Sequence, residues 1–153
     1  VIYARVSTKK QADAGNLQRQ VERLRQYARE QNYHIITEYT DIASGLNQKR
    51  RGLAKVMKAA EQGEFKKLLI EYPDRLARFG YSYIERHLKY CGVEIITAAE
   101  KEPEDSQTEL VRDLLSIVTS FSTRLYGARG GKKIRRGFRE LITGVTKDEK
   151  EIQ

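Results

Sequence analysis

Three arginines and a serine have the types and spacing needed to handle a phosphate group. Arg5 and Ser7 lie two residues apart in "YARVST", and Arg75 and Arg78 lie three apart in "DRLAR". A guanidinium group binds phosphate oxygens through paired hydrogen bonds and keeps its charge at neutral pH. Fixed cations also stabilise the charge that spreads over the oxygens of a phosphoryl transition state. A serine hydroxyl beside such a cluster could therefore attack phosphorus and give a phosphoserine intermediate.

Each of these residues also has an ordinary structural explanation. Ser7 could be a polar strand end or a helix cap, and Arg5 could form a structural ion pair with Asp41 or Asp74. The second arginine pair could lie on a solvated face. A Ser-His-Asp triad has no local support because no histidine lies near Ser7, and the sequence has no glycine-rich phosphate loop. Phosphate binding without chemistry is compatible with all of these observations.

The hydrophobic pattern places the candidate residues at the ends of strands. Apolar runs predict strands over 1–6, 33–40, 66–72 and 93–98, alternating with helices over 16–31, 50–62 and 81–91. This alternation predicts an α/β fold with a mainly parallel sheet and flanking helices, in a three-layer Rossmann-type arrangement. Asn16 is the expected N-cap of the first helix, and Pro73 the expected end of the third strand. Ligands of such sheets bind at the carboxyl ends of strands, where "ARVST", "TDIASG" and "PDRLAR" should meet.

A long helix is expected from about Ser106 to Leu125. Its apolar residues cover more than a single core-facing stripe: Leu110, Val111, Leu114, Leu115, Ile117, Val118, Phe121 and Leu125. Burial within its own domain is the alternative, but a second subunit covers such a helix more easily in a chain of 153 residues. We therefore expect a main domain over residues 1–125, with the helix over 106–125 mediating dimerisation.

The composition changes after Tyr126. Gly127, Gly130 and Gly131 are expected to interrupt the helix, and residues 126–153 to form a basic extension with a short helix. The basic side chains expected to contact DNA are Arg124, Arg129, Lys132, Lys133, Arg135 and Arg136. Such a run most simply contacts the DNA backbone without reading sequence, and a disordered, solvated tail is the alternative.

The overall charge and the cysteine count narrow the class of protein. The formal net charge is +8 and the isoelectric point about 9.6, which favours a polyanionic partner, most simply nucleic acid, over a merely solubilising surface. Cys91 is the only cysteine, which excludes a disulfide framework and favours the cytoplasm. Two histidines are too few to suggest a metal cluster, and no apolar run approaches the roughly 20 residues of a membrane span.

Five motifs carry a family resemblance. "YARVST", "NLQRQ", "DIASG", "KRRGL" and "DRLAR", in this order and spacing, resemble the catalytic domain of serine recombinases, the resolvase and invertase family. "DRLARFG", "GVEII" and "FSTRLYGARGGKK" resemble more narrowly the serine transposases of small insertion sequences. In that branch a DNA-binding domain precedes the catalytic domain, so we expect one upstream of Val1. The resemblance implies a resolvase-like fold, DNA as the substrate, and dimers that pair into tetramers.

The resemblance also implies a role for each matching residue. Ser7 would attack a DNA phosphodiester and form a 5′-phosphoserine link, while Arg5, Arg75 and Arg78 would bind and stabilise the scissile phosphate. The link would conserve the energy of the phosphodiester, so religation would need no cofactor, neither ATP nor a metal ion. The enzyme would work in the cytoplasm of a prokaryote, on nucleoid DNA.

Further positions match less directly. Arg50 falls on another active-site arginine, with Arg51 as the adjacent alternative. The supporting residues would be Tyr3, Gln20, Asp41, Ser44 and Asp74. Pro73 stands where many members of the family have a lysine, and "RLYGARGG" replaces the usual acidic and basic pattern of the long helix. These departures concern the assembly of subunits rather than the chemistry.

The sequence thus supports a transposase catalytic domain, with two alternatives. A site-specific resolvase or invertase would share the chemistry and differ in its targeting domain. A non-catalytic DNA-binding regulator could keep the same fold, although binding alone does not require a serine between phosphate-binding arginines.

Overall fold

The structure, a computed structural model, describes residues 1–47, 49–99 and 104–151. The chain consists of two compact units, Val1–Glu102 and Pro103–Gln153. The elements are β1 (Ile2–Val6), α1 (Lys9–Asp13), α2 (Asn16–Glu30), β2 (Glu38–Ile42), α3 (Arg51–Glu61), β3 (Lys67–Ile70), α4 (Pro73–Leu76), α5 (Tyr81–Tyr90), β4 (Glu94–Thr97) and α6 (Glu104–Glu151). Within the described residues the strands form one parallel sheet in the order β2-β1-β3-β4. The predicted α/β fold is confirmed.

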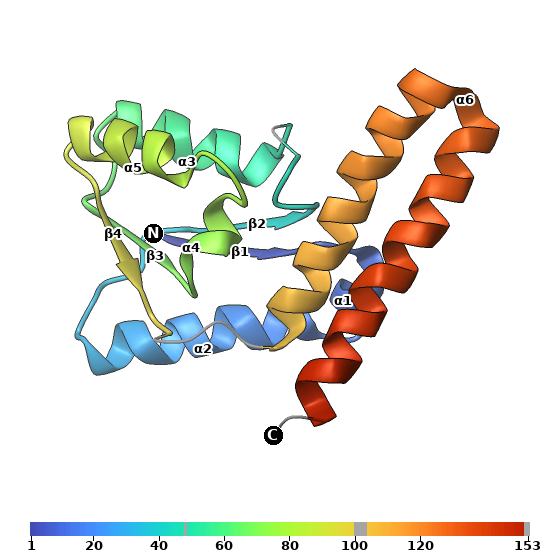
Figure 1. Ribbon diagram of the computed structural model, residues 1–153. Helices are drawn as coiled ribbons and strands as arrows, with labels where there is room; N and C mark the ends of the chain where they lie inside the picture. The colour runs from blue at the N-terminus through green and yellow to red at the C-terminus, as the bar shows by residue number, and fades with distance from the viewer. Residues whose placement is uncertain (48, 100–103, 152–153) are drawn as a thin grey trace. The chain divides into compact units, whose positions relative to one another are not determined.

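Strand β1 lies at the centre of the first unit, and both of its faces are therefore buried. Figure 1 shows α2 on one face of the sheet and α3 and α5 on the other. Ile2, Ala4 and Val6 pack on the α2 side, and Tyr3 packs on the opposite side. Arg5 follows Tyr3 on that side and is fully buried. An arginine in such a place is tolerated only when its donors are hydrogen-bonded and its charge is compensated.

Three local predictions were wrong. Gly15, with φ of 77°, holds the N-cap position of α2, and Asn16 is the first helical residue. Strand β2 begins at Glu38 rather than Tyr33, because the side chains of Tyr33 and Ile35 pack against the α2-side core without joining the sheet. The third strand ends at Ile70, and Pro73 begins the one-turn helix α4 instead.

The second unit consists of α6, two helical arms that meet at Gly127 (Figure 1). The interruption expected there is confirmed, because Gly127 has φ of 69° and ψ of 177°, a conformation that side chains with a Cβ avoid. Gly130 and Gly131 remain helical, so the break expected at those two positions was wrong.

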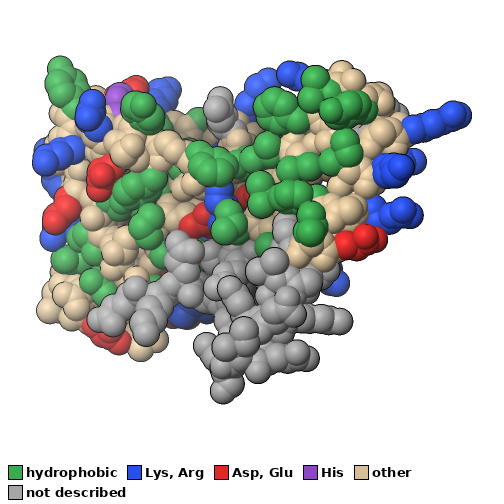
Figure 2. Space-filling model, in the orientation of Figure 1, with side chains coloured by type: hydrophobic (Ala, Val, Ile, Leu, Met, Phe, Trp, Pro, Cys, Tyr) green, Lys and Arg blue, Asp and Glu red, His purple; other side chains and the backbone are tan. Residues whose placement is uncertain are grey.

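Apolar side chains lie uncovered along the first arm of α6. The exposed fractions of Leu110, Leu114, Phe121 and Leu125 run from 40% to 71%. Figure 2 shows hydrophobic side chains gathered over α6 on this face of the molecule. None of the described helices is long and apolar enough to cross a membrane.

Candidate active site

Ser7 directly follows β1, at the carboxyl edge of the sheet. Its hydroxyl oxygen accepts a 2.9 Å hydrogen bond from Arg5 Nη1, and its backbone N–H donates to Gln11 Oε1 at 3.1 Å. Thr8 caps α1 through a reciprocal capping box with Gln11, which fixes the turn after the strand. A cation that donates to a hydroxyl oxygen stabilises its alkoxide form, as a nucleophile requires.

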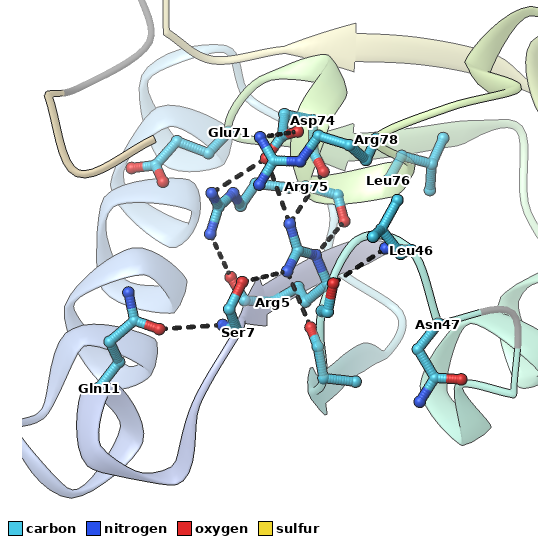
Figure 3. Close-up of polar contacts among 12 residues, drawn as sticks. Arg5, Ser7, Gln11, Leu46, Asn47, Glu71, Asp74, Arg75, Leu76 and Arg78 are labelled. Carbon is cyan, nitrogen blue, oxygen red and sulfur yellow. Dashed lines mark hydrogen bonds and ion pairs between the residues drawn. The ribbon is translucent and has the colours of Figure 1, made fainter. Parts of the chain in front are cut away.

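The guanidinium group of Arg5 is fully hydrogen-bonded (Figure 3). Nε donates to the Arg75 carbonyl at 3.1 Å, and Nη1 donates to Ser7 and to the Ala43 carbonyl at 2.8 Å. Nη2 donates to the carbonyl of Asp74 at 3.0 Å and to its Oδ2 at 3.2 Å. These bonds account for all five donors of an arginine side chain. Arg5 therefore ties the end of β1 to the loop after β2 and to α4.

The Asp74 carboxylate forms ion pairs with Arg5, Arg75 and Arg78. Its Oδ2 lies 3.2 Å from Arg5 Nη2 and 3.1 Å from Arg75 Nη2, while Oδ1 lies 2.6 Å from Arg78 Nη1. All four side chains are at most 7% exposed. The short helix α4, which begins at Pro73 after the two residues that follow β3, places Asp74 and Arg75 in one turn.

Arg50 lies next to this cluster and bonds mainly to the backbone. Its Nε and Nη2 donate to the carbonyls of Asn47 and Leu76 at 2.8 and 2.6 Å, and Nη1 donates to the Tyr3 hydroxyl at 3.1 Å. The neighbouring Arg51 is exposed, so Arg50 is the one of the two adjacent candidates that lies beside the buried cluster. Through these bonds Arg50 connects the loop between β2 and α3 to α4.

Tyr3 and Asp41 extend the site toward α3. The Tyr3 hydroxyl donates to Asp41 Oδ2 at 2.9 Å. Burial raises the pKa of Tyr3 far above its usual value; the Arg50 charge opposes that shift and the Asp41 carboxylate adds to it. Asp41 also accepts the backbone N–H groups of Gly52 and Leu53 at 2.9 Å, at the start of α3. The carboxylate thus compensates the positive end of that helix.

Two glycines of the recognised motifs have a steric explanation. A Cβ at Gly52 would lie 2.6 Å from the Thr40 carbonyl oxygen and 2.7 Å from Asp41 Oδ2. A Cβ at Gly45 would lie 3.1 Å from the Arg78 Cβ and 3.2 Å from Arg5 Nη2. Ser44 shapes the same turn, because its hydroxyl accepts the backbone N–H of Leu46 at 3.1 Å. "DIASG" and "KRRGL" therefore bring backbone close to the arginines and to Asp41.

Gln20 lies on α2 and contacts both Arg5 and Glu71, a residue that the sequence analysis did not identify. Its Oε1 accepts the backbone N–H of Arg5 at 2.7 Å, and its Nε2 donates to Glu71 Oε2 at 2.7 Å. Glu71 is only 7% exposed. The available signal was an acidic residue directly after the apolar "LLI" of the third strand, next to the "PDRLAR" motif.

The basic residues assigned to DNA contact belong to the second unit. Arg124 and Arg135 line a groove of about 560 Å³ between the two arms of α6. The rest of the lining consists of Arg112, Ser116, Thr119, Ser120 and Thr123. The side chains of Arg129, Lys132, Lys133 and Arg136 are exposed on the second arm. Among the side chains that the structure describes, no group of three His, Cys, Asp or Glu could hold a metal ion.

Comparison with known proteins identifies the family. The family described as "Resolvase, N terminal domain" matches residues 1–140. Two proteins of Acanthamoeba polyphaga mimivirus that are named as resolvases are 37% and 36% identical over 130 residues. The match covers 84% of this chain and 65% of either relative, so the chain spans about two thirds of their length.

Solved structures agree with this match. The C-terminal catalytic domain of ISC1926 TnpA, an IS607-like serine recombinase, is 42% identical with a TM-score of 0.83, covering 93% of this chain and 97% of that one. A serine recombinase from Sulfolobus solfataricus is 39% identical with a TM-score of 0.73, covering 92% and 95%. The family match over residues 1–140 and the likeness in sequence and fold to solved serine recombinases lead to one assignment: the chain belongs to the resolvase family of serine recombinases.

Proposed function

We propose that this chain is the catalytic domain of a transposase that cuts and rejoins DNA through a covalent 5′-phosphoserine intermediate. The observation that carries the proposal is the Ser7 hydroxyl, 2.9 Å from the guanidinium group of Arg5 within a buried three-arginine cluster. The likeness to an IS607-like TnpA supports the transposase branch.

The proposed chemistry needs no group beyond the protein and the DNA. The Ser7 oxygen attacks phosphorus, the new O–P bond forms, and the bond from phosphorus to the 3′ oxygen breaks. Ser7 loses its proton, and the released 3′ oxygen takes up a proton. Arg5, Arg75 and Arg78 stabilise the negative charge on the oxygens around phosphorus. The reverse attack by a 3′ hydroxyl restores the phosphodiester after strand exchange.

Covalent trapping tests this proposal. Full-length protein is incubated with suicide DNA that carries the ends of its own element, and adducts are separated under denaturing conditions. We expect an adduct from the wild type and none from Ser7→Ala, which still binds the DNA. Ser82→Ala, a change at an exposed serine of α5, is the matched control and should react like the wild type. An adduct from Ser7→Ala, or none from the wild type, contradicts the proposal.

A site-specific resolvase is the second candidate, because the mimivirus relatives are named as resolvases. The two activities give different products from one plasmid assay. Insertion into unrelated target DNA supports a transposase, whereas deletion or inversion between two fixed sites supports a resolvase or invertase.

We also propose that the protein acts as a homodimer that pairs into a tetramer on DNA, in the cytoplasm of a prokaryote. The exposed stripe of Leu110, Leu114, Phe121 and Leu125 supports a two-fold contact between helices, since water-exposed apolar surface of this kind favours association. The α6 groove supports DNA binding, because three arginines line it and can donate to phosphate together with the hydroxyls of Ser116 and Ser120, while Thr119 and Thr123 donate to helix carbonyls.

A further inference from the structure

A hydrogen-bonded chain of side chains connects the end of β3 to the backbone of the nucleophile strand. Glu71 accepts from Gln20 Nε2 through Oε2 and from Arg23 Nε through Oε1, both at 2.7 Å. Gln20, which is 4% exposed, accepts the backbone N–H of Arg5 at 2.7 Å. This series of hydrogen bonds thus ends at Arg5, two residues before Ser7.

These hydrogen-bonded side chains lie where β1 and β3 no longer pair. Strands β1 and β3 pair at one register position, Ile2 with Leu69. Farther along β1, the backbone of Arg5 bonds to side chains instead: its N–H donates to Gln20, and its carbonyl accepts from Arg75 Nη1 at 2.9 Å. The position of this peptide therefore depends on side chains that reach it from α2 and α4.

The chemistry of Glu71 decides which way the Gln20 amide points. An ionised carboxylate only accepts hydrogen bonds, whereas an amide has a donating and an accepting end. Glu71 therefore holds the NH₂ end of Gln20 and leaves the oxygen for the Arg5 N–H. The opposite orientation would set two donors against each other at Arg5 and two acceptors at Glu71, in a buried place where unmade bonds are costly.

We propose that Glu71 is a positioning residue: through the Gln20 amide it fixes the backbone of Arg5 and so holds the Ser7 hydroxyl against the arginine cluster. The inference rests on the proposed attack by Ser7. It predicts that Glu71 affects the rate of attack rather than the affinity for DNA.

Exchange of the two side chains provides the test. Glu71→Gln removes the acceptor-only partner, and Gln20→Glu sets two carboxylates against each other. The double variant Gln20→Glu/Glu71→Gln rebuilds every bond, because the new carboxylate at position 20 accepts from Arg5 and from the new amide at position 71. The oxygen of that amide accepts from Arg23. Glu38→Gln is the matched control. Glu38 accepts bonds of 2.7 and 2.8 Å from Arg25, which lies on α2, the helix that also carries Gln20.

Two measurements are made at a temperature where melting curves show every variant folded. At saturating suicide DNA, we expect each single variant to form the Ser7 adduct about 10- to 100-fold more slowly, with DNA affinity within about twofold of the wild type. Hydrogen exchange at the Arg5 amide should speed up in the same variants. The double variant should recover both properties, and Glu38→Gln should change neither.

Wild-type rate and exchange in Glu71→Gln, or failure of the double variant to recover, would overturn the role of Glu71. A wild-type protein that forms no adduct would overturn the proposed function instead. The exchange rates of the single and double variants would still decide whether Glu71 positions Arg5.

Discussion

Asp74→Asn removes a charge that three buried guanidinium groups share. The carboxylate oxygens lie 3.2 Å from Arg5, 3.1 Å from Arg75 and 2.6 Å from Arg78, and the four side chains are at most 7% exposed. An asparagine keeps the shape, but it cannot compensate the positive charges. The arginines would remain buried and would repel one another.

The expected loss of stability follows from this burial. Breaking a buried ion pair by removing one partner costs about 3–5 kcal/mol. For a chain of this length, each kcal/mol lowers the melting temperature by about 2–4 °C, so Asp74→Asn should lower it by about 6–20 °C. A bound anion should restore part of the loss, because an anion at a hundred times its Kd contributes about 2.7 kcal/mol.

Thermal melting in chloride and in sulfate at equal ionic strength measures both effects. Sulfate should raise the melting temperature of Asp74→Asn by several degrees more than that of the wild type, in which the carboxylate already occupies the cluster. Glu22→Gln, which breaks exposed bonds to Arg25 and Arg29, should melt like the wild type in both salts. If Asp74→Asn also melts like the wild type, the carboxylate does not hold the arginines together and the reasoning fails.

Two other predictions concern Tyr3 and the long helix. Because burial raises the pKa of Tyr3, the folded state keeps a proton that the unfolded chain releases above about pH 10, so the free energy of unfolding should fall there by up to about 1.4 kcal/mol per pH unit. Urea unfolding of Tyr3→Phe should lack this part of the slope, and parallel curves for the two proteins would contradict it. Phe121→Glu with Leu125→Glu should give a monomeric mass by light scattering at concentrations where the wild type is a dimer. A wild type that is monomeric at high concentration would exclude this contact.

The sequence was sufficient to predict the fold and the edge of the sheet that carries the site. Ser7 and the "DRLAR" motif each follow an apolar strand, and the topology of a parallel sheet brings such positions together regardless of their distance along the chain. The same reasoning could not predict where β2 begins, because the apolar residues Tyr33 and Ile35 pack on the core without strand pairing.

Side-chain partners were harder to predict. The bond from Gln20 to Glu71 joins positions 51 residues apart, and it depends on how helix α2 and the end of β3 are oriented. Nothing in the spacing of either residue specifies that contact. The position of Arg50 depends in the same way on the carbonyls of Asn47 and Leu76, which become available only once their loops are folded.

The shared carboxylate of Asp74 also sets the electrical balance of the site. Four guanidinium charges stand against two carboxylate charges, so two positive charges remain over Arg5, Arg50, Arg75, Arg78, Asp41 and Asp74. In the proposed reaction, an intact phosphodiester would bring one negative charge, and the addition of the Ser7 alkoxide would bring a second. Charge neutrality is then reached only when phosphorus carries five oxygens. A site balanced in this way would favour the transition state of the proposed reaction over the bound substrate, which is the condition for electrostatic catalysis.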